Sequence, residues 1–304
     1  MSTAVQNKFA PHIRIQKTTQ SIMLDVIVAM FPALAAGTYF FGLRALVLTL
    51  VCVATCVLTE FVMQKLLKKQ VRVRDLSAIV TGILLALNLP VEYPFWMAII
   101  GSIFAIAIVK EMFGGIGQNF MNPALAARVF LLVTWPAQTG TFTYDGVVGP
   151  TPLGGRPASL LNLFIGNIPG TIGEVSKLAI LIGFVYLVAR RVIHYRTPLA
   201  YILTCAVLLY LLKYDLEDTL MQVLSGGIIF AAVFMITDYS SSPMSQLGQV
   251  VYAIGAGILT VLIRLYGGYP EGVSLAIIIM NVFVPLIDKH IRPKVFGVSR
   301  GGNK

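Results

Sequence analysis

Ten mostly apolar runs recur along this chain of 304 residues, and they limit its fold more than any other feature of the sequence. Each run holds roughly 16 to 25 residues, enough for one helix to cross a hydrocarbon core about 30 Å thick. Only 12% of the residues are charged, whereas soluble domains carry about 25%. We therefore predict an all-α polytopic membrane protein with about ten transmembrane helices. The predicted spans are 22–42, 44–66, 75–90, 95–112, 121–136, 174–192, 197–213, 219–238, 246–265 and 272–290.

Lysine and arginine residues are distributed unequally between the two sets of loops. If the N-terminus is cytoplasmic, seventeen lie in inner segments and five in outer ones, while Arg128 lies within a span. Because basic residues concentrate on the cytoplasmic side of membrane proteins, both termini are predicted to be cytoplasmic and the loop around Thr151 to face outward. The formal net charge of +10 then reflects topology and the anionic inner leaflet of the bilayer, and nucleic acid is not an expected partner. The outer residues are Arg44, Arg156, Lys177, Lys213 and Arg264.

The two halves of the chain align at a constant offset of 153 residues. The matches are MFGGIGQ (112–118) with LYGGYPE (265–271), Pro90 with Pro243, and Ile22 with Val175. Five spans per half is an odd number, so we expect the second copy to insert upside down, as in transporter-like folds built from inverted repeats. Short or interrupted helices are expected where Gly, Pro and Asn gather, and the spans 75–90, 121–136 and 197–213 are short. The expected interruptions are NLPVEYP, FGGIGQNFMNP, DYSSSP and YGGYPEG.

These features divide the chain into one membrane domain with flanking segments. The predicted divisions are a cytoplasmic arm (1–21), a first five-helix repeat (22–136), an outward loop (137–173), a second five-helix repeat (174–290) and a cytoplasmic tail (291–304). The cysteines Cys52, Cys56 and Cys205 lie in apolar runs without a CxxC pair, so we interpret them as buried apolar side chains. No metal site is expected.

Polar residues inside the predicted spans are the candidates for function. Arg128 lies within the fifth span, with Asn281 at the same repeat offset, and charge within a membrane marks a functional site unless it pairs structurally or reaches the interface. Asn122 and Pro123 predict a helix N-terminus, which either binds an acceptor such as a flavin carbonyl or is an ordinary capped end. Four carboxylates near inner span ends either bind a cation or relay protons, or are simply solvated. They are Asp25, Glu60, Asp238 and Asp288.

Four sequence blocks together resemble a known family. They are DLSAIVTGILLALNLP, FGGIGQNFMNPALAARVFLL, FMITDYSSSP and IRLYGGYPEGVSLAIIIMNVFVPLID. They resemble the NqrB/RnfD family of flavoprotein membrane subunits over nearly the whole chain. The short N-terminal arm is more similar to the Rnf ferredoxin:NAD oxidoreductase branch than to the sodium-pumping quinone reductase branch, whose members usually have a longer cytoplasmic extension.

The resemblance implies a covalent cofactor on the outward loop. In this family a threonine in an S-G-A-T-type sequence downstream of an Asp is esterified by the phosphate of FMN. The stretch DGVVGPT supplies Asp145, Gly149 and Thr151 at that spacing, with Val148 in place of the common Ser and Pro150 in place of the common Ala. A phosphoester of FMN on Thr151 is therefore expected, and an unmodified polar loop is the alternative. Ser159 and Thr143 are nearby hydroxyls that are not expected to carry flavin.

The resemblance also implies a second flavin, non-covalent riboflavin, and a set of partner subunits. Electrons would pass from an FMN-bearing outer-side subunit through the Thr151 FMN and riboflavin toward iron–sulfur and NAD-handling subunits, coupled to Na⁺ or H⁺ translocation. The chain is then a subunit of a redox-driven translocase in a bacterial or archaeal cytoplasmic membrane, inactive without its partners. Besides Thr151, Asp145 and Gly149, the residues assigned to flavin binding are Gly114, Gly115, Asn119, Asn122, Pro123, Arg128 and Asn281.

Three other functions are compatible with the same sequence. One is the B-type subunit of a sodium-pumping NADH:quinone reductase. A second is a channel or transporter for a small solute, which predicts a colourless protein that acts without partner subunits. A third is a structural scaffold, which predicts that Thr151 is replaceable without loss of electron transfer.

Overall fold

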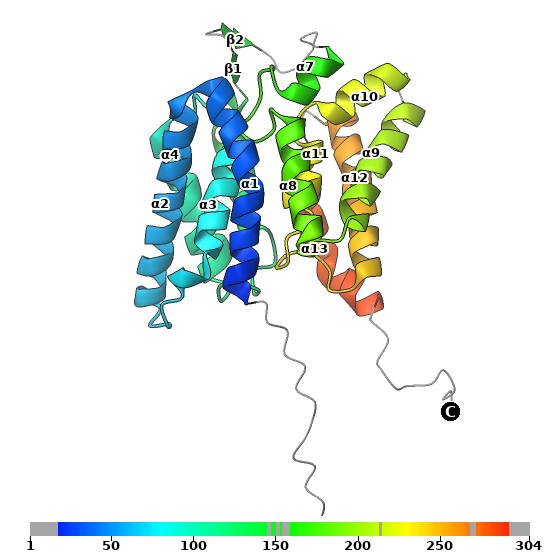
Figure 1. Ribbon diagram of the computed structural model, residues 1–304. Helices are drawn as coiled ribbons and strands as arrows, with labels where there is room; N and C mark the ends of the chain where they lie inside the picture. Colours follow the sequence, from blue (N-terminus) through cyan, green and yellow to red (C-terminus); the bar gives the residue numbers. More distant parts are fainter. Residues whose placement is uncertain are drawn as a thin grey trace, which may run out of the picture.

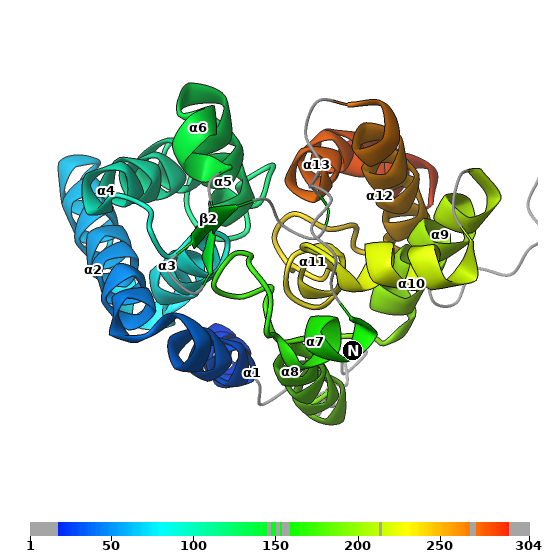
Figure 2. The same ribbon diagram turned by 90° about the horizontal axis from the view of Figure 1, so that it is seen from above.

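The computed structural model describes residues 18–140, 142–144, 147–149, 153, 159–212, 215–267 and 272–291. Seen from above, the helices from α1 to α6 form one group and those from α8 to α13 form another, and α1 and α8 lie side by side where the two groups meet (Figure 2). We call these groups the first half and the second half. The start of α1 and the end of α13 lie at one end of the molecule, the terminal end (Figure 1).

The first half consists of helices of very unequal length. Its elements are α1 (Thr19–Phe41), α2 (Leu43–Leu66), the 3₁₀ turn η1 (Val73–Asp75), α3 (Ser77–Leu87), α4 (Phe95–Ile103), the π-helix η2 (Phe104–Glu111), α5 (Pro123–Thr134) and α6 (Pro136–Thr139). α4 and η2 together cover one predicted span.

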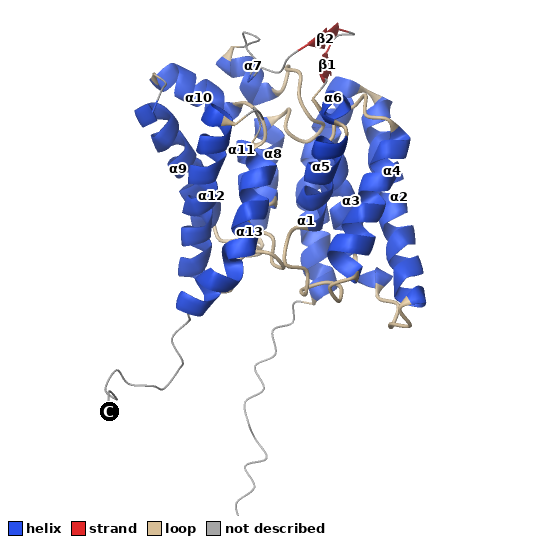
Figure 3. Ribbon diagram, turned by 180° about the vertical axis from the view of Figure 1, so that it is seen from behind, coloured by secondary structure: helices blue, strands red, loops and turns tan. Residues whose placement is uncertain are grey.

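A short hairpin and α7 separate the two halves, at the end of the molecule opposite the chain termini. The hairpin pairs β1 (Phe142–Tyr144) with β2 (Val147–Gly149) in antiparallel register, and α7 is Leu160–Ile165. We call this the hairpin end, and Figure 3 shows that the described strands are confined to it. Gly149 pairs with Phe142 in this hairpin, whereas Asp145 and Thr151 lie outside the described residues.

The second half repeats the mixture of long and short helices. Its elements are α8 (Lys177–Ala189), α9 (Arg196–Leu212), α10 (Leu216–Leu224), α11 (Ile228–Phe234), α12 (Gln246–Tyr266) and α13 (Val273–His290). Each of the ten predicted spans contains helix, and the predicted span 219–238 is not one straight helix. It is broken after Leu224, and α10 and α11 meet at an angle of 53°. The break falls on Ser225, Gly226 and Gly227, and Gly226 has the left-handed φ of 65° that glycine tolerates.

Within the described residues, α1, α2, α12 and α13 are long and apolar enough to cross a membrane, and the bent pair α10–α11 raises the number to five. The shorter apolar helices are α3, α5, α8 and α9. The predicted helical membrane class is therefore confirmed, and the number of ten spans stays a prediction. The predicted interruptions at 88–94 and 238–243 are non-helical as expected, and α5 begins at Pro123 as the sequence predicted.

The backbone carbonyls at the end of the short helix α3 accept hydrogen bonds from a segment that folds back into the molecule. Residues 167–176 lie outside the helices, and the backbone N–H groups of Ile172 and Gly173 donate to the carbonyls of Leu89 (3.2 Å) and Leu87 (2.8 Å). Non-helical backbone at membrane depth needs such partners because lipid supplies none. The sequence had placed residues 166–173 in the outward loop and 174–176 in the next span, so the return of this segment into the core was not predicted.

Glycine permits the close approach of the two halves. A Cβ atom on Gly183 of α8 would lie 2.2 Å from the carbonyl oxygen of Ala29 in α1. Small residues at helix contacts let backbones pack closely, which drives helix association in membranes. The α1–α8 contact therefore fixes the first half against the second and positions the polar residues between them.

Candidate functional site

A small polar cavity lies between the two halves near the terminal end. Its volume is about 50 Å³, and its polar lining includes Asn119 and Asn122 from the first half and Asp238 and Ser240 from the second. An adjacent and more apolar cavity of about 300 Å³ shares Ser240 with it and is open toward the start of α1. We call the two together the interhalf cavity. Met23 and Ile116 belong to the lining of both parts.

The helix start predicted at Asn122 forms one wall of this cavity. The Asn122 side-chain oxygen accepts hydrogen bonds from the backbone N–H groups of Ala124 (3.0 Å) and Leu125 (3.2 Å), and Pro123 takes the first helical position. Both are the expected features of a capped N-terminus, which carries a partial positive charge. The Asn122 amide nitrogen remains directed across the interface, 3.4 Å from the Asp238 carboxylate.

Asp238 is held by the DYSSSP segment of the second half. Its Oδ2 atom accepts hydrogen bonds from the hydroxyls of Ser240 (3.0 Å) and Ser241 (2.8 Å). Ser240 in turn accepts a hydrogen bond from the Asn119 amide at 3.1 Å. The cavity thus brings together amide donors, a carboxylate acceptor and hydroxyls from segments more than 100 residues apart in the sequence.

Asn281 supports this wall from α13. Its neighbours fit an amide that donates to the Tyr252 hydroxyl (2.6 Å) and the Ser241 carbonyl (3.1 Å) and accepts from the Asn122 backbone N–H (3.1 Å). Asn281 is fully buried and is not part of the cavity lining; it contacts the lining residue Asn122 from behind. The sequence did not indicate Tyr252, a buried residue whose hydroxyl accepts the hydrogen bond from the Asn281 amide.

Arg128 is buried deeper in the membrane domain than the interhalf cavity. Its Nη1 atom donates to Asn88 (2.7 Å) and pairs with Glu174 (3.2 Å), so it links the first half to the segment 166–176. Glu174 and Lys177 were not among the sequence candidates. The Lys177 ammonium is fully buried and donates to the carbonyls of Glu174 and Gly226. Arg128 does not line the interhalf cavity, and its contact with a flavin stays a prediction.

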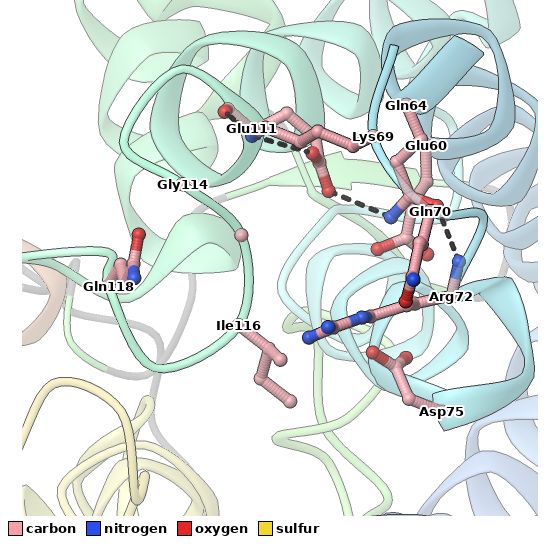
Figure 4. Close-up of a pocket in the computed structure, with 11 residues that line it drawn as sticks. Glu60, Gln64, Lys69, Gln70, Arg72, Asp75, Glu111, Gly114, Ile116 and Gln118 are labelled. Atoms are coloured by element: carbon pink, nitrogen blue, oxygen red, sulfur yellow. Dashed lines mark hydrogen bonds and ion pairs between the residues drawn. The ribbon is translucent and has the colours of Figure 1, made fainter. Parts of the chain in front are cut away.

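A second polar cavity lies at the terminal end of the first half. Its volume is about 280 Å³, and Figure 4 shows Glu111 from η2 beside Lys69 and Gln64. Glu111 Oε1 accepts from the Gln64 amide (3.1 Å), and Oε2 lies 3.6 Å from the Lys69 ammonium. We call it the carboxylate cavity. The predicted flavin residues Gly114 and Gly115 line this cavity, which shares Ile116 with the interhalf cavity lined by Asn119 and Asn122.

Glu60 also lines the carboxylate cavity and forms a buried ion pair. Lys110 Nζ lies 2.5 Å from Glu60 Oε1 and 2.6 Å from the Ser77 hydroxyl, and both charged side chains are almost fully buried. The sequence had placed Lys110 in an inner segment. Lys110 and Glu111 are both buried in η2, which is π-helical, and such wide turns are frequent at functional sites.

The remaining carboxylates are dispersed. The buried Asp25 accepts hydrogen bonds from Tyr186 (3.0 Å) and Arg190 (3.2 Å), and Asp288 accepts from the backbone N–H of Met244 (3.1 Å). Asp25 and Glu60 are therefore paired structurally, and the alternative that they are merely solvated is wrong. Among the described residues no group of three His, Cys, Asp or Glu side chains is placed to hold a metal ion. All three cysteines are buried, as interpreted.

Comparison with known proteins identifies the family. The NQR2, RnfD, RnfE family matches residues 6–297. The chain is 49% identical to the D subunit of the Na(+)-translocating ferredoxin:NAD(+) oxidoreductase complex of Acetobacterium woodii, over 96% of this chain and 95% of the relative. It is 37% identical to the D subunit of the proton-translocating ferredoxin:NAD(+) oxidoreductase complex of Clostridium ljungdahlii, with 96% of each chain covered. It is also 37% identical to the D subunit of the ion-translocating oxidoreductase complex of Stutzerimonas stutzeri, with 95% of each covered. The chain therefore belongs to the NQR2, RnfD, RnfE family.

Proposed function

We propose that the chain is a flavin-carrying D-type subunit of an ion-translocating ferredoxin:NAD oxidoreductase complex. The names of the relatives support this assignment, because those that resemble the chain over nearly its full length are D subunits of such complexes. In this proposal the subunit passes electrons between ferredoxin-side and NAD-side subunits and acts only within the complex. Two of these relatives translocate different ions, Na⁺ and H⁺, so both remain candidates here.

The proposed membrane arrangement is ten spans in two inverted repeats with both termini in the cytoplasm. At the offset of 153 residues, α2 falls on α9, α4 and η2 fall on α12, and α5 falls on α13. One polar contact also repeats at that offset. Arg128 donates to Asn88 in the first half, and Asn281 donates to the carbonyl of Ser241 in the second. Both described chain ends lie at the terminal end, which suits an even number of spans.

The interhalf cavity is the proposed site of non-covalent riboflavin. A flavin ring has an apolar end and a polar end with carbonyl acceptors and one N–H donor. The cavity offers a matching pair of surfaces, apolar at Ile22 and Met23 and polar at Asn119, Asn122 and Asp238. The larger part, at about 300 Å³, is at the lower limit of ligand pockets. Bound there, the flavin supplies one- or two-electron transfer, while these side chains hold and orient it.

The covalent FMN is proposed on Thr151 from the family motif. Support comes from the position of the neighbouring chain. Gly149 and Phe142 pair at the hairpin end, and Leu153 reaches the bend between α10 and α11, where its Cδ1 atom would lie 2.7 Å from a Cβ on Gly226. Gly149 and Leu153, on either side of Thr151, therefore lie at the hairpin end, which supports an FMN site at that end.

The ion path is proposed to involve the four carboxylates named from the sequence. Glu60 carries the strongest argument, since a buried carboxylate is costly unless paired, and its Oε2 atom has no described hydrogen-bond partner while the residue lines the carboxylate cavity. Asp25, Asp238 and Asp288 lie at the same terminal end but in separate contacts.

The single observation that carries the proposal is the pair of surfaces in the interhalf cavity, and its test is flavin release. Denaturing the purified protein and filtering it should release riboflavin in an amount equal to the protein. Asn119→Ala should lower that amount severalfold, because it removes the amide that joins the two halves at Ser240. The covalent flavin retained on the filter is the internal control. Wild-type protein without releasable riboflavin would remove this site from the proposal.

A further inference from the structure

A third cavity, which the electron path and the ion path do not use, lies at the terminal end of the second half. Its volume is about 440 Å³, and it is enclosed by the α8–α9 connection, the segment 237–244 and the first turns of α9 and α12. Its polar lining comes from guanidinium, imidazole, amide and hydroxyl groups. They belong to Arg191, His194, Thr197, Ser242, Gln246 and Gln249. We call it the α9–α12 cavity.

The lining has the chemistry of an anion site. None of the described residues that line it carries a carboxylate, and Arg191 supplies guanidinium N–H donors, while His194 Nε2 accepts from the Gln246 amide nitrogen at 3.3 Å. Two carboxylates adjoin the lining without being part of it. Asp238, between Thr237 and Tyr239, accepts from the hydroxyls of Ser240 and Ser241, and Asp288 Oδ1 accepts a hydrogen bond from Met244 N–H at 3.1 Å. Charge-assisted hydrogen bonds from such donors to phosphate are about twice as strong as neutral ones.

Arg191 is held at the rim by an unusual backbone. Its φ is 53°, in the left-handed region that side-chain-bearing residues rarely occupy. Glycine would adopt this conformation without strain. The arginine therefore does not stabilise the turn more than glycine would. Strained residues that persist in this way cluster at functional sites.

A different side chain stands at the corresponding place in the first half. There Arg44 fills the space, and its Nε atom donates to the carbonyl of Val91 (2.9 Å) and pairs with Glu92 (3.6 Å). At the repeat offset of 153 residues, Arg44 corresponds to Thr197, which is too short to do the same.

Apolar surface continues from the cavity along both helices. Within two turns of it, Leu199 and Leu203 on α9 and Leu247 and Val251 on α12 are exposed. A polar pocket at the helix ends, continued by apolar side chains along the helices, matches a phospholipid, which joins a phosphate headgroup to acyl chains. A free phosphate ion would use only the polar part.

We propose that the α9–α12 cavity binds the phosphodiester headgroup of an anionic phospholipid, with Arg191 as its principal contact. Basic pockets on the cytoplasmic side of membrane proteins hold anionic lipids in this way. A zwitterionic lipid would place its ammonium in a cavity whose described lining offers no carboxylate, so phosphatidylglycerol should be preferred to phosphatidylethanolamine.

Native mass spectrometry of the full-length protein, delipidated in detergent and titrated with either lipid, tests the proposal. Wild type should retain phosphatidylglycerol, and Arg191→Gln should weaken its binding about tenfold, the loss expected for one charge-assisted contact. Arg196→Gln is the matched control, since Arg196 is exposed at the start of α9 but outside the lining. Equal losses in both variants, or equal retention of both lipids by wild type, would overturn the proposal.

Arg191→Gly separates lipid binding from folding. The variant loses the charge but relieves the left-handed backbone, so it should keep or raise its unfolding temperature while losing phosphatidylglycerol as Arg191→Gln does. Retention of the lipid by Arg191→Gly would contradict the assignment. A competition experiment with inorganic phosphate distinguishes a lipid headgroup site from a free-phosphate site. Millimolar phosphate should leave the bound lipid in place, and full displacement would show a free-phosphate site instead.

Discussion

Arg128 shows how a buried charge is accommodated at the scale of a single residue. It is only 5% exposed, and its guanidinium contacts the Asn88 amide and the Glu174 carboxylate. Glu174 lies in the segment that folds back between the halves, so the ion pair also holds that segment in place. The low-dielectric interior makes such a pair costly to break, because the partner left behind is a buried charge.

Arg128→Leu should therefore destabilise the protein by about 3–5 kcal/mol, the usual cost of removing one partner of a buried pair. The double variant Arg128→Leu with Glu174→Gln should lose much less than the sum of the two single changes, because no unpaired charge remains. Arg44→Leu is the control, since its partner Glu92 is half-exposed. Thermal unfolding in detergent measures each effect, and additive losses would show that the pair is not coupled.

The sequence predicted the role of a single residue where that role depends on its neighbours in the chain. Asn122 and Pro123 were predicted as a helix start because capping depends on a few neighbouring positions, and the structure confirms both. Lys110 and Lys177 were counted with the inner and outer segments, and Glu174 was not singled out, yet all three are buried. Their burial depends on contacts with residues far away in the chain or on a π-helix, and neither leaves a periodic signal in the sequence.

At the scale of elements, broken helices shape the interior. α3 ends at Leu87, and the bent pair α10–α11 breaks at Gly226. Backbone N–H and C=O groups therefore lack helical hydrogen-bond partners at both places. The segment 166–176 supplies hydrogen bonds to α3 through Gly173. A Cβ on Gly173 would lie 2.6 Å from the Leu87 Cβ and 3.0 Å from its carbonyl oxygen, so only glycine fits without a shift.

Gly173→Ala should lower the free energy of unfolding by about 1–3 kcal/mol, the usual cost of overpacking. Gly170→Ala is a matched control from the same segment, because its nearest neighbour would be 3.9 Å away, an ordinary contact distance. Thermal unfolding of both variants in detergent compares them. Equal stability of the two would mean that the segment does not pack against α3 as described.

Element breaks were predictable only where proline marked them. The segments NLPVEYP and DYSSSP contain proline and are non-helical, as the sequence indicated. The break at 225–227 follows an apolar run without proline, so composition favoured one continuous span. The segment 166–176 is polar enough for an outer loop, and only its hydrogen bonds to Leu87 and Leu89 show that it enters the core.

For the whole molecule, the central question is how the two ends relate to the membrane. The described chain ends share the terminal end, and the hairpin lies at the opposite end (Figure 1). The lysine and arginine distribution predicts that the terminal end is cytoplasmic. The proposed electron path then runs from the Thr151 flavin outside to the interhalf cavity inside.

Cysteine labelling with a membrane-impermeant reagent tests this orientation in intact cells. A cysteine at position 68, in the turn after α2, should be protected, whereas one at position 161 on α7 should react. Leu161 is a suitable site because it is exposed at the hairpin end. Labelling at position 68 with protection at position 161 would reverse the predicted orientation.

The attachment of FMN to Thr151 is the most direct test of the account, because a solute channel and a scaffold require no flavin there. We expect the denatured, purified wild type to fluoresce in a gel, with the added mass mapped to the peptide that contains Thr151. Thr151→Ser should retain part of the signal. Thr151→Ala should lose it while its expression and unfolding temperature stay unchanged. A Thr151→Ala protein that still carries flavin, or a wild type that never does, would contradict the account.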